Sequence, residues 1–259
     1  MLSIIIVSFN ARADLERCLA SLHAPPPRTP HEILVVDNAS SDGSLDAVRQ
    51  WPDVRTIANA SNVGFAAANN VGIRASRGDL LLLLNSDTIV PAGAIETLVA
   101  ELEADPSVAV AGPRLVDASG RAELSFGPMI SPLNEWRQKR LRRDAAAVER
   151  LTRERRYPDW VSGACLLVRR AAAEAVGLLD ERFFMYTEDV DFCASIRARG
   201  SRVLFTPAAE VVHVRGRSAA SAPAATTRAY RTSQLAFYRK HHPMWAPLLR
   251  LYVSLRKAD

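Results

Sequence analysis

Four short polar segments, three directly after a predicted strand and one a few residues beyond a strand, carry residue types that could bind a charged ligand. They are Ser8-Phe-Asn10, Asp37-Asn-Ala-Ser-Ser-Asp-Gly43, Asn62-Val-Gly-Phe65 and Asn85-Ser-Asp87. Such groups can accept hydrogen bonds from a base and a ribose, and carboxylates can hold a cation against a diphosphate. The chain has neither Gly-x-Gly-x-x-Gly nor Gly-x4-Gly-Lys-Ser/Thr. Neither a dinucleotide-binding fold nor a phosphate-loop NTPase is therefore indicated.

The elements that must position these segments are strands alternating with helices. Apolar runs predict strands at 3–7, 32–36, 54–58, 80–84 and 108–111, and helical spacing predicts helices through 15–22, 44–50, 64–75 and 91–104. This alternation is typical of a parallel sheet covered by helices on both faces. Ligands of such sheets bind beyond the carboxyl ends of the strands. We therefore expect the four polar segments to lie on one rim.

The second half of the chain is less regular. We expect a hairpin over 115–126 around Asp117-Ala-Ser-Gly120, and a mobile insert with a basic helical patch over 127–158. Further strands are predicted at 161–168, 202–206 and 210–214, and helices at 170–176 and 188–199, the latter closed by Gly200.

Composition narrows the class of protein. The 259 residues are 48% apolar and 24% charged, which is typical of a globular protein and excludes wholesale disorder, collagen and coiled coil. Three widely spaced cysteines, Cys18, Cys165 and Cys193, fit neither a disulfide framework nor a zinc ribbon. The first ten residues lack a basic region, and the longest aliphatic run, 80–84, is far shorter than the about 20 residues of a membrane span. We expect a cytoplasmic protein.

Positive charge is concentrated in two places. The net charge is +5, but residues 214–259 hold nine basic residues and one acid, so the first 213 residues carry −3. Residues 137–156 form a second basic segment. In the tail, an apolar stripe at helical spacing consists of Trp245, Leu248, Leu249, Tyr252 and Val253. It predicts either a basic amphipathic helix on a membrane surface or packing on the core or on a second subunit. Nucleic acid is not expected, because aromatic residues do not alternate with the basic ones.

Several motifs together resemble the family 2 glycosyltransferases of GT-A fold. They are Ser3-Ile-Ile-Ile-Val-Ser-Phe-Asn10, Val35-Val-Asp-Asn-Ala-Ser-Ser-Asp-Gly-Ser44, Asn62-Val-Gly-Phe-Ala-Ala-Ala-Asn-Asn-Val-Gly-Ile73, Leu82-Leu-Leu-Asn-Ser-Asp87 and Tyr186-Thr-Glu-Asp-Val-Asp-Phe192. The resemblance covers about residues 2–218 and is strongest to bacterial rhamnosyltransferase-type enzymes of surface polysaccharide assembly. It implies an α/β, GT-A domain over 1–218, with a Rossmann-like, mostly parallel nucleotide-binding sheet in 1–112 and an acceptor and catalytic half in 113–218. Residues 219–259 would form the helical tail.

For the metal and the diphosphate, the resemblance points to two motifs. The family's Asp-x-Asp triplet, whose last Asp binds Mg²⁺ or Mn²⁺, corresponds to Asn85-Ser86-Asp87, so only one carboxylate remains. The alternative is that these residues cap the turn before the next helix. The segment from His213 to Ser218 resembles a late His-x-x-Gly-x-Ser motif. It implies that His213 is a second metal ligand and that Arg215 and Ser218 lie at the diphosphate, although Arg215 could instead only solvate the tail.

The nucleotide would be held at the rim. By resemblance, Asp37 and Asn38 read the pyrimidine edge and the ribose, with an Asx turn as the alternative. We expect Gly64 to let the backbone approach the nucleotide closely. The remaining nucleotide-binding candidates are Ser8, Asn10, Asn70, Asn85 and Ser86.

The catalytic base implied by the family's Glu-Asp motif is Asp189. A sugar hydroxyl must lose its proton as it attacks the anomeric carbon, and attack opposite the leaving nucleotide inverts the configuration. The acids of this segment could alternatively serve only the positive helix N-terminus. Glu188 and Asp191 would hold acceptor or scaffold contacts. Trp160 and Gly163 would form the acceptor wall, unless Trp160 is a core residue.

The expected activity is therefore an inverting glycosyl transfer, assisted by Mg²⁺ or Mn²⁺. The donor would be dTDP-rhamnose or another nucleotide-activated hexose of dTDP or UDP type, and the acceptor a hydroxyl of a cell-surface glycan or of a lipid-linked glycan. The inner face of the membrane and a homodimer are further candidate partners. One alternative is a sugar-1-phosphate nucleotidylyltransferase, which needs a Gly-rich basic loop where this chain has Ser8-Phe-Asn-Ala-Arg12. The other is a membrane-attached glycan-binding module without turnover.

Overall fold

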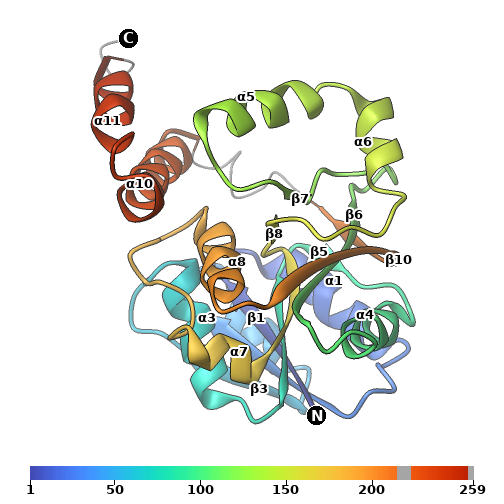
Figure 1. Ribbon diagram of the computed structural model, residues 1–259. Helices are drawn as coiled ribbons and strands as arrows, with labels where there is room; N and C mark the ends of the chain where they lie inside the picture. Colours follow the sequence, from blue (N-terminus) through green and yellow to red (C-terminus); the bar gives the residue numbers. More distant parts are fainter. Residues whose placement is uncertain (215–222, 256–259) are drawn as a thin grey trace.

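The computed structural model describes residues 1–214 and 223–255, arranged around one large curled sheet (Figure 1). The strands are β1 (Leu2–Ser8), β2 (His31–Asp37), β3 (Val54–Ala58), β4 (Leu80–Asn85), β5 (Thr88–Ile89), β6 (Val108–Val116), β7 (Phe126–Gly127), β8 (Trp160–Val161), β9 (Cys165–Arg169) and β10 (Arg202–His213). The helices are α1 (Arg12–His23), α2 (Ser44–Val48), α3 (Phe65–Ala75), α4 (Ala94–Glu103), α5 (Pro132–Leu141), α6 (Ala145–Leu151), α7 (Arg170–Ala175), α8 (Glu188–Ala198), α10 (Pro223–His241) and α11 (Ala246–Leu255).

The eight-stranded sheet has the order β3-β2-β1-β4-β9-β6-β10-β5. Strands β3, β2, β1 and β4 pair in parallel, and β10 is parallel to β6. Strand β9 runs antiparallel between β4 and β6, and the short β5 closes the edge antiparallel to β10. The predicted α/β class with a mostly parallel sheet is confirmed, and the first five strands and four helices lie where the sequence places them.

Both faces of the sheet are buried, which explains why its central strands read as continuous apolar runs. All seven residues of β1 are buried. Successive side chains of a strand point to opposite faces, so Ile5 packs in one core cluster with α3 and α8, whereas Ile4 and Ile6 pack in the other with α1 and α4. Packing on both sides thus fixes where each strand ends, and with it the position of the rim.

Three expectations for the second half are corrected. The turn at Asp117–Gly120 forms, but the antiparallel pairing of the expected hairpin is limited to a bridge between Val116 and Ala122. The strand expected over 161–168 is divided into β8 and β9 by a turn at 162–164. The two late strands are one, β10, because a register shift between Thr206 and Glu210 keeps it paired with β6.

The basic insert and the tail both form helices against the body. Residues 127–158 contain α5 and α6, and α5 buries none of its side chains. In the tail, Phe237 and Tyr238 of α10 are fully buried, and the Tyr238 hydroxyl donates to Glu135 Oε2 of α5 at 2.7 Å. Helix α10 is therefore part of the packed body. Among the described residues, no helix has the length and apolarity to span a bilayer.

Candidate active site

Three neighbouring parallel strands end side by side in polar residues. The register pairs Ser8 of β1 with Asp37 of β2, and Val7 with Asn85 of β4. Each end carries a buried oxygen with no hydrogen-bond partner within the described residues, namely Ser8 Oγ, Asp37 Oδ1 and Asn85 Oδ1. An unsatisfied buried polar group costs about 1–3 kcal/mol. Three such atoms at adjoining strand ends indicate a rim suited to a polar ligand.

Asn38 has a different place from the one predicted. Its side chain is 2% exposed, and its amide nitrogen donates to Asn62 Oδ1 at 2.9 Å and to the Gly64 carbonyl at 3.2 Å. Its oxygen accepts from Asn59 Nδ2 at 3.0 Å and from the Val63 N–H at 3.1 Å. An amide side chain has two donors and two lone pairs, so Asn38 is saturated. It holds the 59–64 loop in place and cannot also pair with a base edge.

Gly64 is required by the protein's own backbone. It has a φ of +88°, and a Cβ at this position would lie 2.5 Å from the Phe184 carbonyl oxygen. The neighbouring Phe65 N–H donates to that same oxygen at 2.7 Å. The group that closely approaches Gly64 in the structure is the 183–187 loop, which covers the start of α3, and the predicted approach to a nucleotide stays a prediction.

Asn10 and Asn70 both tie loops together. Asn10 Oδ1 accepts the Ser41 N–H at 2.8 Å, which joins the exit of β1 to the loop after β2 at the rim. The structure corrects the prediction that Asn70 binds the nucleotide at the rim. Asn70 is buried on α3, donates to the Leu179 carbonyl at 2.8 Å and to Glu181 at 2.9 Å, and accepts the Leu179 N–H at 3.0 Å. Its amide faces the 179–181 loop and not the rim.

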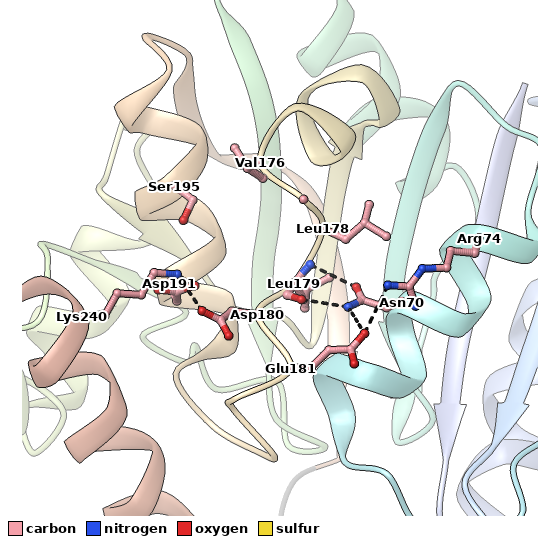
Figure 2. A pocket seen from close by; sticks show the side chains of 11 residues that line it. Asn70, Arg74, Val176, Leu178, Leu179, Asp180, Glu181, Asp191, Ser195 and Lys240 are labelled. Carbon is pink, nitrogen blue, oxygen red and sulfur yellow. Dashed lines mark hydrogen bonds and ion pairs between the residues drawn. The ribbon is translucent and has the colours of Figure 1, made fainter.

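Figure 2 shows Asn70 at the wall of a polar cavity of about 410 Å³ between α3, the 176–181 loop, α8 and α10. On the opposite wall, Lys240 bonds to Asp180 and to Asp191, at 2.9 Å and 2.8 Å. The charged groups that line this cavity are thus paired with one another. None of the rim residues lines the cavity.

Asp87 and His213 meet at the end of β10. His213 Nε2 lies 3.3 Å from Asp87 Oδ1, and the Val214 N–H donates to the Asp87 carbonyl at 2.8 Å. On the other side of the ring, His213 Nδ1 lies 3.2 Å from Glu123 Oε2. Burial alone would lower the pKa of His213, but hydrogen bonds to Asp87 and Glu123 and their negative charges outweigh it and raise the pKa.

This carboxylate and imidazole are both ligands of divalent cations. In the part of the chain that the structure describes, no group of three or more His, Cys, Asp or Glu residues could hold a metal ion. A pair of ligands suits an open site, because Mg²⁺-type cations are commonly held by one or two carboxylates plus substrate phosphates.

Asp189 is half-buried in the first turn of α8 and is positioned by the 162–164 turn. Its Oδ2 accepts the Gly163 N–H at 2.9 Å. A Cβ on residue 163 would lie 3.3 Å from the Asp189 Cβ, so a glycine lets the turn come this close. The next residue, Ala164, accepts the Asn85 N–H at 2.9 Å. Asp189 is therefore connected by two hydrogen bonds to the strand end that leads into Asp87.

Two non-glycine residues with positive φ precede this helix, Tyr186 at 71° and Thr187 at 65°. Such conformations are uncommon outside glycine and cluster at functional sites. Glu188 follows them and is 7% exposed, with Oε2 unpaired within the described residues. Burial first, and then the charge of Asp189, raise the pKa of Glu188 well above its usual value. Its buried position therefore favours the protonated form of Glu188.

Trp160 and Asp191 do not face an acceptor. Trp160 is 7% exposed, belongs to the core cluster, and donates from Nε1 to the Pro128 carbonyl at 2.9 Å. Its role as an acceptor wall is corrected in favour of core packing. Asp191 is 1% exposed, and its two oxygens are taken by His241 Nε2 at 2.6 Å and Lys240 Nζ at 2.8 Å. Of its two predicted roles, the scaffold contact is the one observed.

Three predicted site residues remain, of which the structure describes one. Ser86 lies half-buried between Asn85 and Asp87 at the rim. Arg215 and Ser218 fall outside the described residues. Sequence reasoning missed Glu123, because nothing in a lone acidic residue of an expected hairpin indicates a partner 90 positions away. It also missed Lys240, read only as part of the tail's positive charge.

Comparisons with known proteins identify the family of the chain. The model of glycosyl transferase family 2 matches residues 3–175. The N-acetylglucosaminyl-diphospho-decaprenol L-rhamnosyltransferase of Mycobacterium tuberculosis is 32% identical over 99% of this chain and 91% of that protein. A low-salt glycan biosynthesis hexosyltransferase, Agl10 of Haloferax volcanii, is 26% identical over 82% of this chain and 66% of that protein.

Solved structures share the fold. The mannosyltransferase PcManGT of Pyrobaculum calidifontis, in complex with GDP-Man and Mn²⁺, superposes with a TM-score of 0.66 at 21% identity over 96% of this chain and 68% of that one. GalNAc-T7 with UDP, GalNAc and Mn²⁺ gives 0.64 at 20% identity over 83% and 44%. The nucleotidylyltransferase and the glycan-binding module are therefore set aside. The chain belongs to glycosyl transferase family 2 and is a glycosyltransferase of GT-A fold.

Proposed function

We propose that this enzyme is an inverting rhamnosyltransferase. It transfers L-rhamnose from dTDP-rhamnose to a hydroxyl of a sugar that is linked through a diphosphate to a lipid. The similarity over nearly the whole chain to the mycobacterial L-rhamnosyltransferase supports the sugar and the class of acceptor. Such an acceptor would place the enzyme at the inner face of a membrane.

The observation that carries the proposal is the chain of contacts from Asp189 to the rim. A half-buried carboxylate is held by Gly163, and the adjoining Ala164 is bonded to Asn85 at the end of β4. A transferase needs a base for the acceptor beside a place for the departing nucleotide, and this turn supports both.

Asp189 acts as the general base in this proposal. Its Oδ1 and Oδ2 accept N–H groups of Val190 and Gly163, which orient the carboxylate. It removes the proton of the acceptor hydroxyl while the oxygen attacks the anomeric carbon from the face opposite the leaving dTDP, so the configuration inverts. Because the pKa of Glu188 is raised by burial and Asp189 is the less buried of the two, Asp189 is the carboxylate that serves as the base.

The rim binds the donor in this proposal. The unpartnered oxygens of Ser8, Asp37 and Asn85 accept hydrogen bonds from the nucleobase and the ribose of the donor. Ser86 lies beside them, toward Asp87. Asn10, Asn38 and Gly64 shape the loops around the nucleotide and do not read it themselves.

Asp87 and His213 would hold Mg²⁺ or Mn²⁺. When bound, the cation would neutralise the charge that develops on the leaving diphosphate. Glu123, at His213 Nδ1, fixes the ring so that Nε2 faces Asp87, as carboxylates behind metal-bound histidines do. Arg215 and Ser218 are proposed to contact the same diphosphate.

Nucleotide-dependent thermal unfolding, followed by a transfer assay, tests the donor. The melting temperature should rise most with dTDP, and Mn²⁺ should increase that rise. Radiolabelled dTDP-rhamnose should then label a lipid-linked N-acetylglucosaminyl diphosphate, with inversion established by NMR of the product. A larger stabilisation by GDP than by dTDP, or transfer of a different hexose in preference to rhamnose, would refute the proposed donor.

A further inference from the structure

Helix α5 presents an unusual exposed face. Leu133 is 54% exposed and Trp136 is 58% exposed, and Arg137 and Arg140 lie on the same stripe at helical spacing. Arg140 lies over the Trp136 ring at 5.9 Å. Large apolar side chains without cover, next to arginines, are typical of helices that lie in the plane of a bilayer interface.

The charge on this helix is one-sided. Residues 132–143 contain five basic residues, Arg137, Lys139, Arg140, Arg142 and Arg143, and all five are exposed. The one acid of the segment, Glu135, is turned toward α10, where it accepts hydrogen bonds from Gln234 and Tyr238. The outward side of α5 is therefore purely basic, which complements an anionic surface.

A second apolar face adjoins the first. Of the tail's predicted stripe, Leu249 is half-buried against the core, whereas Trp245 and Leu248 are 52% and 59% exposed. Leu251, which is not part of the predicted stripe, is 58% exposed. Met244, just before α11, is 89% exposed. Part of α11 thus packs on the body, and the side chains of Tyr252 and Val253, also predicted for the stripe, fall outside those that the structure describes.

The two helices begin at one junction. His242 Nε2, just before α11, lies 2.7 Å from the carbonyl of Ile130, just before α5. Both helices lie at the same end of the molecule, away from the N-terminus (Figure 1). This end is joined to the catalytic helix, since His241 and Lys240 contact Asp191 of α8.

From this juxtaposition we propose that α5 and the exposed stripe of α11 form one membrane-docking surface, whose occupant is an anionic phospholipid bilayer. Trp136, Trp245 and the leucines enter the interface, while the arginines of α5 contact lipid phosphates. The inference rests on the proposed function in one respect, because docking would bring the enzyme to a lipid-linked acceptor. The binding to the bilayer itself requires no sugar.

Co-sedimentation with vesicles tests the surface. The full chain should bind vesicles of phosphatidylcholine with 30% phosphatidylglycerol, bind phosphatidylcholine alone far more weakly, and lose binding as salt rises. The variants Leu133→Ser/Trp136→Ser and Arg137→Gln/Arg140→Gln should each reduce the partition coefficient about tenfold or more, because each basic residue near the surface contributes about 1 kcal/mol. Trp245→Ser/Leu248→Ser should weaken binding similarly. All these side chains are exposed, so melting temperatures should stay unchanged.

Two matched controls lie elsewhere on the surface. The first is Arg49→Gln, directly after α2, and the second is Tyr157→Ser, whose hydroxyl bonds to Asp105 before β6. Both variants should bind vesicles like the wild type. Wild-type binding by both α5 variants would overturn the proposal. So would light scattering that shows a dimer which the α5 variants convert to monomers, with no vesicle binding by the wild type, because a second copy would then cover this face.

Activity separates this inference from the proposed function. On a water-soluble acceptor without its lipid chain, the α5 variants should keep wild-type transfer rates. Vesicle binding that depends on α5, in an enzyme that transfers no rhamnose, would refute the proposed function and leave the docking surface standing.

Discussion

The carboxylate of Asp189 accepts the backbone N–H of Gly163 at 2.9 Å, across a separation of 26 residues. The same turn reaches the donor side, because Ala164 accepts the N–H of Asn85. The strand break at 162–164 therefore does more than interrupt a hydrophobic run. It holds Asp189, the proposed base, close to the rim, and glycine is the residue that allows this close contact.

Replacing the proposed base should slow transfer strongly. Asp189→Asn keeps the shape of the side chain but cannot take a proton, so kcat should fall by about 10²- to 10⁴-fold. The Kd for dTDP, measured by calorimetry, should stay within about twofold, because no rim group changes. Turnover close to that of the wild type would contradict the assignment.

Removing the carboxylate behind His213 should weaken metal binding. Glu123→Gln should lower the affinity for Mn²⁺ by about 10- to 100-fold, and Asp87→Ala should lower it further, since a proposed ligand is lost. Binding is measured by electron paramagnetic resonance of free Mn²⁺ in the presence of dTDP. Glu103→Gln, on the exposed end of α4, is the control. Equal Mn²⁺ affinity in Glu123→Gln and the control would exclude the role of Glu123.

A methyl group at residue 64 should displace the 183–187 loop. Gly64→Ala should destabilise the fold by about 2–4 kcal/mol, because positive φ is strained for alanine and the Cβ would meet the Phe184 carbonyl at 2.5 Å. Gly93→Ala shares the positive φ, at +80°, but has nothing within 4 Å. Urea unfolding should therefore show a cost of only about 1–2 kcal/mol for Gly93→Ala. Equal losses in the two variants would show that the contact with Phe184 contributes nothing.

The protonation of Glu188 should appear as a pH-dependent stability. Its pKa is raised in the folded protein, so the folded state holds a proton that the unfolded chain releases above about pH 4.3. The stability contribution of this group therefore falls as pH rises from the unfolded toward the folded pKa. Glu188→Gln cannot ionise and should melt like the wild type at pH 4 but higher than the wild type at pH 8. A variant that melts lower at pH 8 would mean that the folded protein stabilises the Glu188 carboxylate, so that its pKa is not raised.

The contact of α10 with α8 should contribute measurably to stability. Asp191→Ala removes a carboxylate that is 2% exposed and leaves Lys240 with Asp180 alone and His241 without this partner. The expected loss, read from urea unfolding, is about 2–4 kcal/mol. Asp46→Ala breaks an exposed pair with Arg49 and should cost less than about 1 kcal/mol. Losses of similar size would show that α10 is held by its apolar contacts instead.

The strand ends could be predicted because their signals are local. The buried runs of β1, β2 and β4 and the polar residues after them are contiguous in sequence, and parallel pairing brings their carboxyl ends to one edge. Ser8, Asp37 and Asn85 therefore lie together as expected. The Glu-Asp pair likewise stands at a helix start that sequence spacing indicates.

The amides and the tryptophan could not be placed in this way. Whether Asn38 reads a base or holds a loop depends on which groups fill its four hydrogen-bonding positions, and only folding brings Asn59, Asn62 and Gly64 to them. In the sequence alone, a tryptophan at position 160 is equally compatible with an acceptor wall and with a hydrophobic core. Its burial is set by neighbours from distant segments.

By itself, the sequence determined the mostly parallel sheet, the succession of its first five predicted strands and four helices along the chain, and the polar rim, since periodicity and strand-end polarity are encoded in adjacent residues. The candidate base came from the resemblance of the Glu-Asp pair to a family motif. Only the tertiary structure decided that Glu123 supports His213, that Asn70 is hydrogen-bonded to the 179–181 loop, and that α5 and α11 begin at one junction. Those contacts join residues about 90 to 110 positions apart, and their partners are selected by packing of the whole chain, which no local pattern records.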